Sequence, residues 1–384
     1  MKIALAHKRL DLKGGTERDL FKTAEGLRDL GHNVHLFCSE YGVNPPDGVT
    51  AHRVAATPLG RTARLWSFAL RAPKLIQKEG CDVAIGFGRM ADVDVLRCGG
   101  GTHRGFLKRL ADEGGGCRRI WQTISIYHQS LLALERREFA AERVKKIIAV
   151  SDEVKRDILS YYAVPPDRIA VLYNGVDAVR FHPQRRCDFR KAIRERWKVP
   201  AEAPLVLFVG SGFRRKGLER LLALWQSSKF AAVYLLVAGS DARLGHYQNV
   251  AQAIAPGRIV FAGRQDVIEN FYAAADVVAL PALQEAFGNV VLEALASGLP
   301  VLVSRGVGAA SILRGSLLDG IVDRPENSGE LSSKLLTLLA KANDPSLRQE
   351  ARSIGEDYSW ERHFQQLDAL LGEVCAKSAN TRII

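Results

Sequence analysis

The feature that most constrains the fold is an alternation of short hydrophobic runs with longer helical segments along the whole chain. Most of these runs are nearly continuous in apolar residues, which is typical of parallel strands covered by helices on both faces. We therefore predict an α/β fold built on parallel sheets. The predicted strands are Lys2–Ala6, Val34–Cys38, Asp82–Gly86, Ile147–Val150, Ile169–Leu172, Leu205–Val209, Val233–Ala238, Arg258–Phe261, Asp276–Leu280 and Pro300–Val303.

The length of the chain predicts more than one domain. At 384 residues it exceeds the usual single domain, so two domains of roughly 150–200 residues are expected. A polar, basic stretch from His182 to Ala203 precedes a fresh strand at Leu205–Val209, which opens a second series of strands and helices. We place the boundary at the start of this stretch, giving domains of residues 1–182 and 183–360.

Charge and cysteine content restrict the partners and the environment. The formal net charge of +12 indicates an anionic partner, which could be nucleic acid, an acidic membrane face or a phosphorylated substrate. The six cysteines are scattered without a Cys-x-x-Cys pair, which argues for a cytosolic protein and against a disulfide framework or a zinc site. No apolar run reaches the roughly 18–20 residues of a membrane span, and the apolar start at Met1–Ala6 is too short for a signal sequence.

Each predicted domain opens with a strand, a polar loop containing glycine, and a helix. The first loop contains Gly14-Gly15-Thr16, and the second runs from Ser211 to Gly217. In open parallel sheets, ligands bind beyond the carboxyl ends of strands, where such loops lie. The second loop carries Arg214-Arg215-Lys216, and a basic run at a helix start opposes the helix dipole unless an anion is present. Neither loop matches a Gly-x-Gly-x-x-Gly fingerprint or a Walker motif.

Two glutamates, Glu285 and Glu293, flank a turn at Phe287-Gly288 that leads into a short helix near Asn289. Glu293 is the only charge on this apolar helix, and a buried carboxylate needs hydrogen-bond donors. Ribose hydroxyls would serve as such donors, and the amides at the helix start would attract a diphosphate. The residues alone leave a second interpretation open, namely a capping glutamate followed by a surface glutamate.

Taken together, these motifs resemble the retaining glycosyltransferases of family 4. The resemblance covers nearly the whole chain. Within the family, the chain is most similar to the lipopolysaccharide core α-1,3-glucosyltransferases, in the stretches 14–19, 86–90, 209–217 and 284–286. The matching motifs are Gly14-Gly15, Arg215-Lys216-Gly217, Ala273-Ala-Ala-Asp276, the pair Glu285 and Glu293, and Ala296-Ser-Gly-Leu-Pro300.

The resemblance implies a GT-B fold, in which two Rossmann-like, doubly wound parallel-sheet domains face each other across a cleft. The N-terminal domain would lie on the acceptor side, with a C-terminal helix at about 361–384 packing back on it, and the C-terminal domain would bind the nucleotide sugar. The implied reaction moves a hexose, most readily glucose from UDP-glucose, onto a lipopolysaccharide inner-core heptose or a similar glycolipid, with retained anomeric configuration. No cofactor and no metal ion are expected, because cationic side chains would neutralise the diphosphate.

The resemblance also implies roles for individual residues. Catalytic roles fall to His103 at the sugar 6-hydroxyl, to Arg215 and Lys216 at the leaving diphosphate, and to Glu285 at hydroxyls of the donor sugar. Asp19 is a candidate for binding the acceptor. The residues expected to bind the donor are Gly15, Thr16, Arg264 beside the nucleobase, Ala286, Phe287, Gly288, Asn289, Val290 and, on the ribose, Glu293.

The segment 104–137 combines basic residues with an apolar face that carries aromatic residues. This pattern fits a helix resting on anionic lipid, although a helix packed on its own sheet shows it too. The net charge and a lipid-linked acceptor favour the membrane, so we expect peripheral attachment to the cytoplasmic face of the inner membrane. The residues concerned are Arg104, Lys108, Arg109, Arg118, Arg119, Ile120, Trp121, Ile124, Ile126, Tyr127, Leu131, Leu132, Arg136 and Arg137.

A family 4 enzyme could instead use another nucleotide sugar and a soluble acceptor. A basic nucleic-acid-binding protein is disfavoured, because the charges lack the interleaved aromatic residues on which bases stack. The motif Asp92-Val-Asp94 has the form of the Asp-x-Asp of metal-dependent transferases but lacks its context, and we interpret it as structural.

Overall fold

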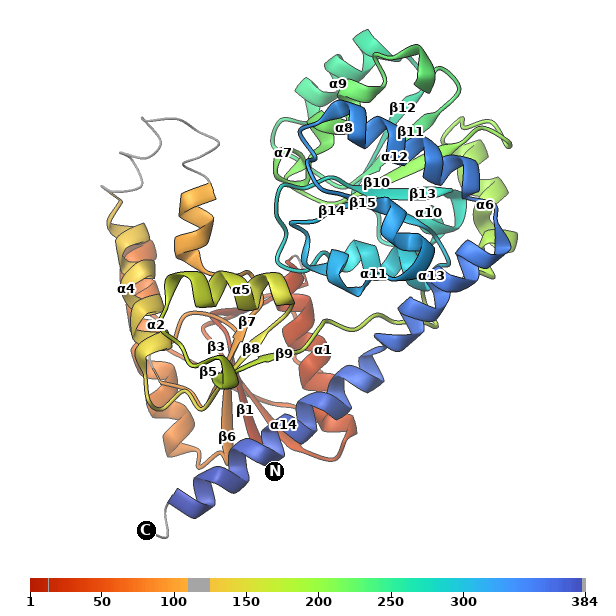
Figure 1. Cartoon of the computed structure of the whole chain (residues 1–384). Helices are drawn as coiled ribbons and strands as arrows, with labels where there is room; N and C mark the ends of the chain where they lie inside the picture. Colours follow the sequence, from red (N-terminus) through yellow and green to blue (C-terminus); the bar gives the residue numbers. More distant parts are fainter. Residues whose placement is uncertain (13, 91, 110–124, 382–384) are drawn as a thin grey trace. The chain divides into compact units, whose positions relative to one another are not determined.

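The computed structural model describes residues 1–12, 14–90, 92–109 and 125–381. The chain divides into two compact units (Figure 1). Unit 1 contains Met1–Asn174 and the segment from Glu361 onward, and unit 2 contains Gly175–Trp360. Each unit is built on a parallel sheet, so the predicted α/β architecture with two sheets is confirmed. Among the described helices, none combines the length and hydrophobicity that crossing a bilayer requires.

The sheet of unit 1 has the order β5-β3-β1-β6-β7-β8-β9. Its first strand lies in the middle, so the strand order reverses between β1 and β6, where open parallel sheets bind ligands. Two strands were not predicted from the sequence: β5, which is polar, and β7, which contains a buried arginine. The strands are β1 (Lys2–Ala6), β3 (Asn33–Cys38), β5 (Thr50–Arg53), β6 (Val83–Gly86), β7 (Val95–Cys98), β8 (Lys146–Ala149) and β9 (Ile169–Val171), with a small separate pair, β2 (Arg9–Leu10) and β4 (Glu40–Tyr41).

Helices at the two ends of the chain complete the core of unit 1. Leu20, Ala24 and Leu27 of the first helix pack with Leu367 and Leu371 of the last helix against β1 and β3. The two helices touch closely at Gly26, where a Cβ atom would lie 2.1 Å from the Phe364 ring. Figure 1 shows this pairing of segments from opposite ends of the sequence. The helices of unit 1 are α1 (Gly15–Asp29), α2 (Gly60–Lys78), α4 (Ile126–Ala140), α5 (Asp152–Tyr161) and α14 (Trp360–Thr381).

Unit 2 repeats this winding with the strand order β12-β11-β10-β13-β14-β15. Its first strand, β10, is again central, and the order reverses between β10 and β13. Sequence analysis missed the two-residue edge strand β15. The strands are β10 (Leu205–Val209), β11 (Tyr234–Ala238), β12 (Ile259–Gly263), β13 (Val277–Leu280), β14 (Val301–Ser304) and β15 (Ile321–Val322).

The core of unit 2 lies between this sheet and its helices. Val206, Phe208 and Leu235 of the strands pack against leucines of α8 and α12 and against Tyr247 of α9. A further helix pair touches closely, because a Cβ atom at Gly355 of α13 would lie 2.4 Å from Ala296 of α11. The helices are α6 (Arg185–Arg196), α7 (Phe213–Lys216), α8 (Leu218–Leu224), α9 (Leu244–Ile254), α10 (Glu269–Ala274), α11 (Asn289–Ala296), α12 (Ser328–Lys341) and α13 (Pro345–Asp357).

The boundary between the units differs from the predicted one. The chain leaves unit 1 after Asn174, not at His182, and it returns to unit 1 at Glu361. Residues 175–182 belong to unit 2 because Val176 exchanges backbone hydrogen bonds with Tyr358 and Trp360, at 2.9 and 3.3 Å. The polar stretch that follows the predicted boundary contains α6, which is part of unit 2, in agreement with its assignment to the second domain.

An arginine cluster binds α6 to the start of β13. Arg194 is 2% exposed and donates to Asp276 Oδ2 at 2.8 Å. Arg186 and Arg190 each lie 3.0 Å from Asp276 Oδ1, and the backbone NH of Leu205 donates to Oδ2 at 2.9 Å. Burial alone would raise the pKa of Asp276, but Arg190 and Arg194 outweigh it and the net shift is downward. This carboxylate therefore neutralises basic residues of the polar stretch that follows the predicted domain boundary.

We predict that Asp276→Ala lowers the free energy of unfolding by about 3–5 kcal/mol, because it leaves the buried Arg194 charge without its partner. Urea denaturation followed by circular dichroism measures the change. Asp319→Ala is the control, since it breaks the exposed ion pair with Lys341 and should change little. Equal destabilisation by the two substitutions would contradict this role for Asp276.

Candidate functional site

In unit 2, glycines allow the loops at the carboxyl ends of the strands to lie against each other. Gly217 follows α7 with φ +84°, and a Cβ atom there would lie 2.1 Å from the carbonyl oxygen of Pro281. Gly239, after β11, has φ +138°, and its Cβ would lie 1.7 Å from the carbonyl oxygen of Gly210. A side chain at either position would push these loops apart. The loops after β10, β11 and β13 are therefore fixed together.

This packing brings Arg215, Lys216 and Glu285 into one cluster. Arg215 Nη1 forms an ion pair and hydrogen bond with Glu285 Oε2, and Lys216 Nζ lies 3.5 Å from the same oxygen. The Lys216 side chain is only 11% exposed, against 52% for Arg215. Burial lowers the pKa of Lys216, and the Glu285 carboxylate opposes this shift. Because one carboxylate faces two cations, the cluster retains positive charge that can attract an anion.

The turn that follows Glu285 is held by the loop after β14. Gly288 has φ +96° and precedes α11. Ala286, Phe287 and Gly288 form the turn, while Asn289 and Val290 open the helix with the positive end of its dipole. Predictions of a turn and a helix start here are thus confirmed. The backbone hydrogen bonds that hold the turn run from Glu285 N to Gly306 O at 3.2 Å, from Gly308 N to Glu285 O at 3.0 Å and from Ala309 N to Phe287 O at 2.8 Å.

Glu293 has a hydrogen-bond donor that sequence analysis missed. The hydroxyl of Tyr272, on α10, donates to Glu293 Oε2 at 2.5 Å. Burial, with the neighbouring carboxylate, raises the pKa of Tyr272 well above its usual value, so the phenol stays protonated. We expected this carboxylate to need hydrogen-bond donors, and Tyr272 is one such donor. No regular spacing in the sequence predicts that these two residues form a pair. Ribose binding by Glu293 stays a prediction.

Arg264 lies at the end of a strand of the unit 2 sheet. It is exposed and directly follows β12, at the carboxyl end of that strand. The adjacent Gly263 accepts a backbone hydrogen bond from Gly239 at 2.8 Å, which ties this strand end to the glycine contacts described above. The predicted contact of Arg264 with a nucleobase stays a prediction.

The remaining predicted residues lie on unit 1. Gly15 and Thr16 open α1, which follows β1. Asp19, one turn further on, is buried and accepts a hydrogen bond from Arg97 Nη2 at 3.0 Å. The same nitrogen donates to Asn174 Oδ1 at 2.7 Å. Asp19 thus has a structural partner in the buried arginine of β7, and its role toward an acceptor stays a prediction.

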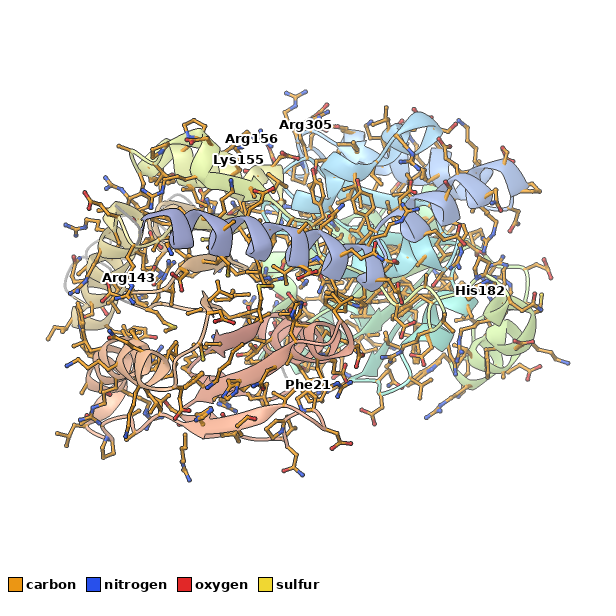
Figure 2. The ribbon with its side chains drawn as sticks, turned by 90° about the horizontal axis from the view of Figure 1, so that it is seen from below. Phe21, Arg143, Lys155, Arg156, His182 and Arg305 are labelled. Carbon is orange, nitrogen blue, oxygen red and sulfur yellow. The ribbon has the colours of Figure 1, made fainter. Side chains whose placement is uncertain are left out.

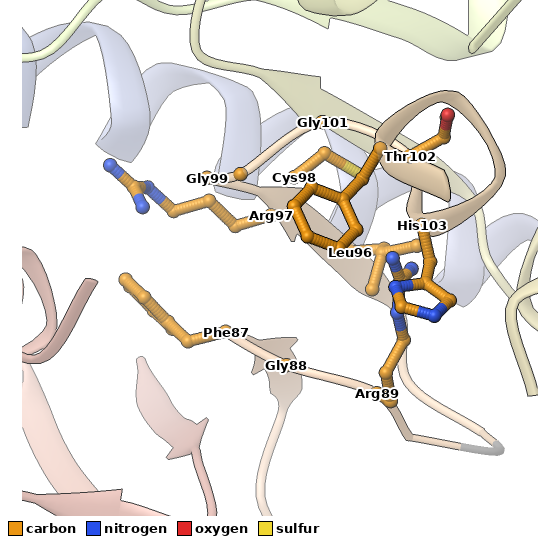
Figure 3. Close-up of a pocket in the computed structure, with 12 residues that line it drawn as sticks. Phe87, Gly88, Arg89, Leu96, Arg97, Cys98, Gly99, Gly101, Thr102 and His103 are labelled. Carbon is orange, nitrogen blue, oxygen red and sulfur yellow. The ribbon is translucent and has the colours of Figure 1, made fainter. Parts of the chain in front are cut away.

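His103 lines a pocket at the carboxyl ends of β6 and β7 (Figure 3). Phe87 and Arg89 follow β6, and the glycine run 99–101 follows β7. In Figure 3 the guanidinium of Arg97 points away from His103. The imidazole Nε2 of His103 lies 3.1 Å from Nδ1 of His128, and burial lowers the pKa of His103 to about 4. His103 is therefore a neutral imidazole at physiological pH, able to donate or accept a hydrogen bond.

Two buried glutamates of α4 hold this pocket in place, and sequence analysis missed both. Glu135 accepts hydrogen bonds from the backbone NH groups of His103 and Arg104 and pairs with Arg89. Glu138 pairs with Arg89 at 3.0 Å, and burial raises the pKa of Glu138 to about 7. They are three residues apart, which places them on one face of a helix. This spacing was the feature of the sequence from which the pair could have been predicted.

The Asp92-Val-Asp94 motif and the basic segment 104–137 both lie in unit 1. Asp94 accepts a hydrogen bond from the backbone of Ala84 at 2.9 Å and pairs with Lys145 at 3.2 Å, which is a structural role. In the segment 104–137, Arg109 pairs with Asp157 at 3.0 Å, and Ile126 on α4 is 73% exposed. Residues 110–124, which include Arg118 and Arg119, lie outside the described residues.

Two family models match the chain. The model described as "Glycosyltransferase Family 4" matches residues 13–180, and that described as "Glycosyl transferases group 1" matches residues 189–356. Among curated proteins, the lipopolysaccharide glucosyltransferase WaaG of Escherichia coli (strain K12) is 27% identical over 337 residues, which are 86% of this chain and 87% of WaaG. A probable transglycosylase of Burkholderia thailandensis is 28% identical over 389 residues, 99% of either chain.

Solved structures agree with these matches. The crystal structure of WaaG, described as a glycosyltransferase involved in lipopolysaccharide biosynthesis, has a TM-score of 0.79 at 21% identity and covers 96% of this chain and 99% of its own. Anabaena HepE in complex with UDP-glucose has a TM-score of 0.70 at 18% identity, covering 97% and 100%. With both of its Rossmann-like units matched by glycosyltransferase models, the chain belongs to the family 4 glycosyltransferases of the GT-B fold.

Proposed function

We propose that the enzyme is a retaining, metal-independent hexosyltransferase that uses UDP-glucose and acts on a lipopolysaccharide inner-core heptose or a similar glycolipid. The observation that carries the proposal is the cluster of Arg215, Lys216 and Glu285 beside the start of α11. Two cations and a helix dipole can stabilise the charge of a departing diphosphate. The relationship to WaaG supports glucose and a lipopolysaccharide acceptor, and the HepE complex supports a uridine nucleotide.

In the proposed reaction, the oxygen of an acceptor hydroxyl attacks C1 of the sugar as the bond between C1 and the phosphate oxygen breaks. The transition state resembles an oxocarbenium ion beside an anionic diphosphate. Arg215 and Lys216 favour this state by charge-assisted hydrogen bonds to the diphosphate. A diphosphate oxygen accepts the proton of the hydroxyl on the same face, so UDP leaves and the anomeric configuration is retained.

The other proposed contacts orient the donor. Glu285 would exchange its Arg215 partner in part for sugar hydroxyls, and Glu293 would accept hydrogen bonds from the ribose beside Tyr272. Neutral His103 would bind the 6-hydroxyl of the hexose. Gly15, Thr16 and the turn 286–290 would offer backbone amides to the phosphates, and Arg264 would lie by the nucleobase.

We further propose that unit 1 attaches the enzyme peripherally to the cytoplasmic face of an anionic membrane through the segment 104–137. Phe106 is 43% exposed and Ile126 is 73% exposed, one on either side of residues 110–124. Basic side chains occur elsewhere on the unit, and Figure 2 labels Arg143, Lys155 and Arg156. Exposed apolar and basic side chains on the same unit suit the interface of an anionic bilayer.

The donor and the stereochemistry are tested together. With a core oligosaccharide acceptor and UDP-glucose, we expect mass spectrometry to show the addition of one hexose and NMR to show an α-linkage. UDP-galactose and UDP-N-acetylglucosamine should give less product. Glu293→Ala should weaken UDP binding by about 1.5–3 kcal/mol in calorimetry, the scale of a hydrogen bond to a charged group. A β-linked product, or unchanged UDP binding in Glu293→Ala, would contradict the assignment.

For the cationic cluster, we predict that Lys216→Ala or Arg215→Ala lowers kcat by about 10²–10³-fold, the effect of removing one oxyanion donor. Steady-state release of UDP measures this. Arg214→Ala is the matched control, because Arg214 lies on the same short helix and is exposed, and it should retain activity. Activity should also persist in EDTA. Loss of transfer on chelation, restored by Mg²⁺, would overturn the metal-independent mechanism.

Membrane attachment is tested by cosedimentation with anionic liposomes at low and high salt. Arg118→Glu with Arg119→Glu should reduce binding, because each basic residue near an anionic surface contributes about 1 kcal/mol. The control, Lys191→Glu with Lys229→Glu, makes the same change in net charge at exposed positions of unit 2 and should bind normally. An equal loss of liposome binding in both double variants would indicate a general effect of net charge. It would contradict attachment through the segment 104–137.

A further inference from the structure

Apart from the loops at the strand ends, three potential metal ligands meet near one edge of the unit 1 sheet. They are His35 on β3, His52 on β5 and Glu79 just after α2, and one ligand atom from each lies within 4.8 Å of the others. Residues two apart share a face of a strand, so His35 and Phe37 lie side by side. The Phe37 ring stacks on His52 with centroids 4.4 Å apart, and the centroid of the His35 ring lies 5.0 Å from that of His52. The three ligands thus come from three elements, and the sheet register pairs His52 with Phe37, two residues beyond His35.

The spacing of the two imidazoles suits a shared ion. His35 Nδ1 and His52 Nε2 are 2.8 Å apart. With metal–nitrogen bonds of ~2.0–2.1 Å, nitrogens at this spacing would subtend about 85° at the ion. That angle is close to the right angle of octahedral or tetragonal sites, and a separation larger by about half an ångström gives the tetrahedral angle. The rings need little movement to bind one metal.

The charge states of His35 and Glu79 also suit the binding of a cation. Burial lowers the pKa of His35, and the charges of Lys2 and His52 act in the same direction, with Glu79 opposing them. His35 is therefore neutral at physiological pH, the form in which imidazole binds metals. The Nε2 atom of His35 is buried without a hydrogen-bond partner in the described parts of the chain, so no such partner commits the ring to one tautomer. Glu79 adds a carboxylate, which has an oxygen 3.8 Å from Nδ1, the other ring nitrogen of His52, and a ligand atom within 4.8 Å of one on each histidine.

We propose that His35, His52 and Glu79 bind one divalent transition-metal ion of the Zn²⁺ type, with water completing its coordination. Such an ion would take the place of the proton shared by the two imidazoles. It would also tie the edge strand β5 to the end of α2, which stabilises unit 1. Glu79 follows α2 and precedes β6, so it lies at the amino ends of the strands. The ion would lie at the β5 edge of the sheet, and β1 separates its strands from β6 and β7, which lead to the pocket of His103, so it would take no part in transfer.

Zn²⁺ titration of the full chain, stripped of metal by a chelator, tests the site. Calorimetry should show one equivalent bound, with a higher melting temperature on addition of Zn²⁺. Co²⁺ as a spectroscopic probe should give visible absorption typical of bound nitrogen ligands. His52→Asn and Glu79→Gln should each weaken binding by more than about 100-fold, since outer-shell partners alone are worth 10–100-fold.

His246→Asn is the matched control, because His246 is an exposed histidine of unit 2 and its loss should leave the titration unchanged. Glu79→Gln changes a partly exposed side chain at a helix end, so it keeps the test valid if His52→Asn fails to fold. Wild-type affinity in Glu79→Gln, or the absence of stoichiometric binding by the unaltered chain, would overturn the proposal. Transfer activity of Glu79→Gln should equal that of the wild type, which separates this site from the proposed reaction.

Discussion

The organisation of unit 2 depends on the absence of side chains at Gly217 and Gly239. Each backbone lies so close to a neighbouring carbonyl that a Cβ atom would overlap with it. Only because these loops touch can Arg215 and Lys216, after β10, meet Glu285, after β13. Two cations would repel each other without this shared carboxylate. The glycines thus set the distance between charges that are far apart in the sequence, and the catalytic proposal rests on that distance.

In unit 1, the loops at the strand ends are held together by buried charges, not by glycine contacts. Arg89 binds both Glu135 and Glu138, which are fully buried on α4. Such a network is costly to desolvate and is stable only when every member has partners. Here the carboxylates also accept backbone hydrogen bonds from Met90 and His103. The loops around His103 are therefore held by charge on a neighbouring helix, while burial lowers the pKa of the histidine itself.

Much of this arrangement follows from local sequence, and the rest does not. Continuous apolar runs predicted both sheets, because burial on two faces leaves a plain hydrophobic signal. The polar β5 and the arginine in β7 gave no such signal. Arg215, Lys216 and Glu285 were identified from motifs and from resemblance to a family. Tyr272 beside Glu293, and Asp276 within its arginines, depend on tertiary contacts that no spacing reveals. The boundary at Asn174 was missed because residues 175–182 join unit 2 through a tertiary contact, in which the backbone of Val176 bonds to Tyr358 and Trp360.

The pairing of α1 with α14 has a consequence for how the chain is made. Leu367 and Leu371 cover apolar residues of α1 that are synthesised more than 300 residues earlier. The ribosome therefore completes unit 2 while the N-terminal sheet still lacks its last helix. During that interval, an apolar face of the first half is exposed to water and to other chains, a state that favours aggregation. The part of the protein that emerges first is the part that folds to completion last.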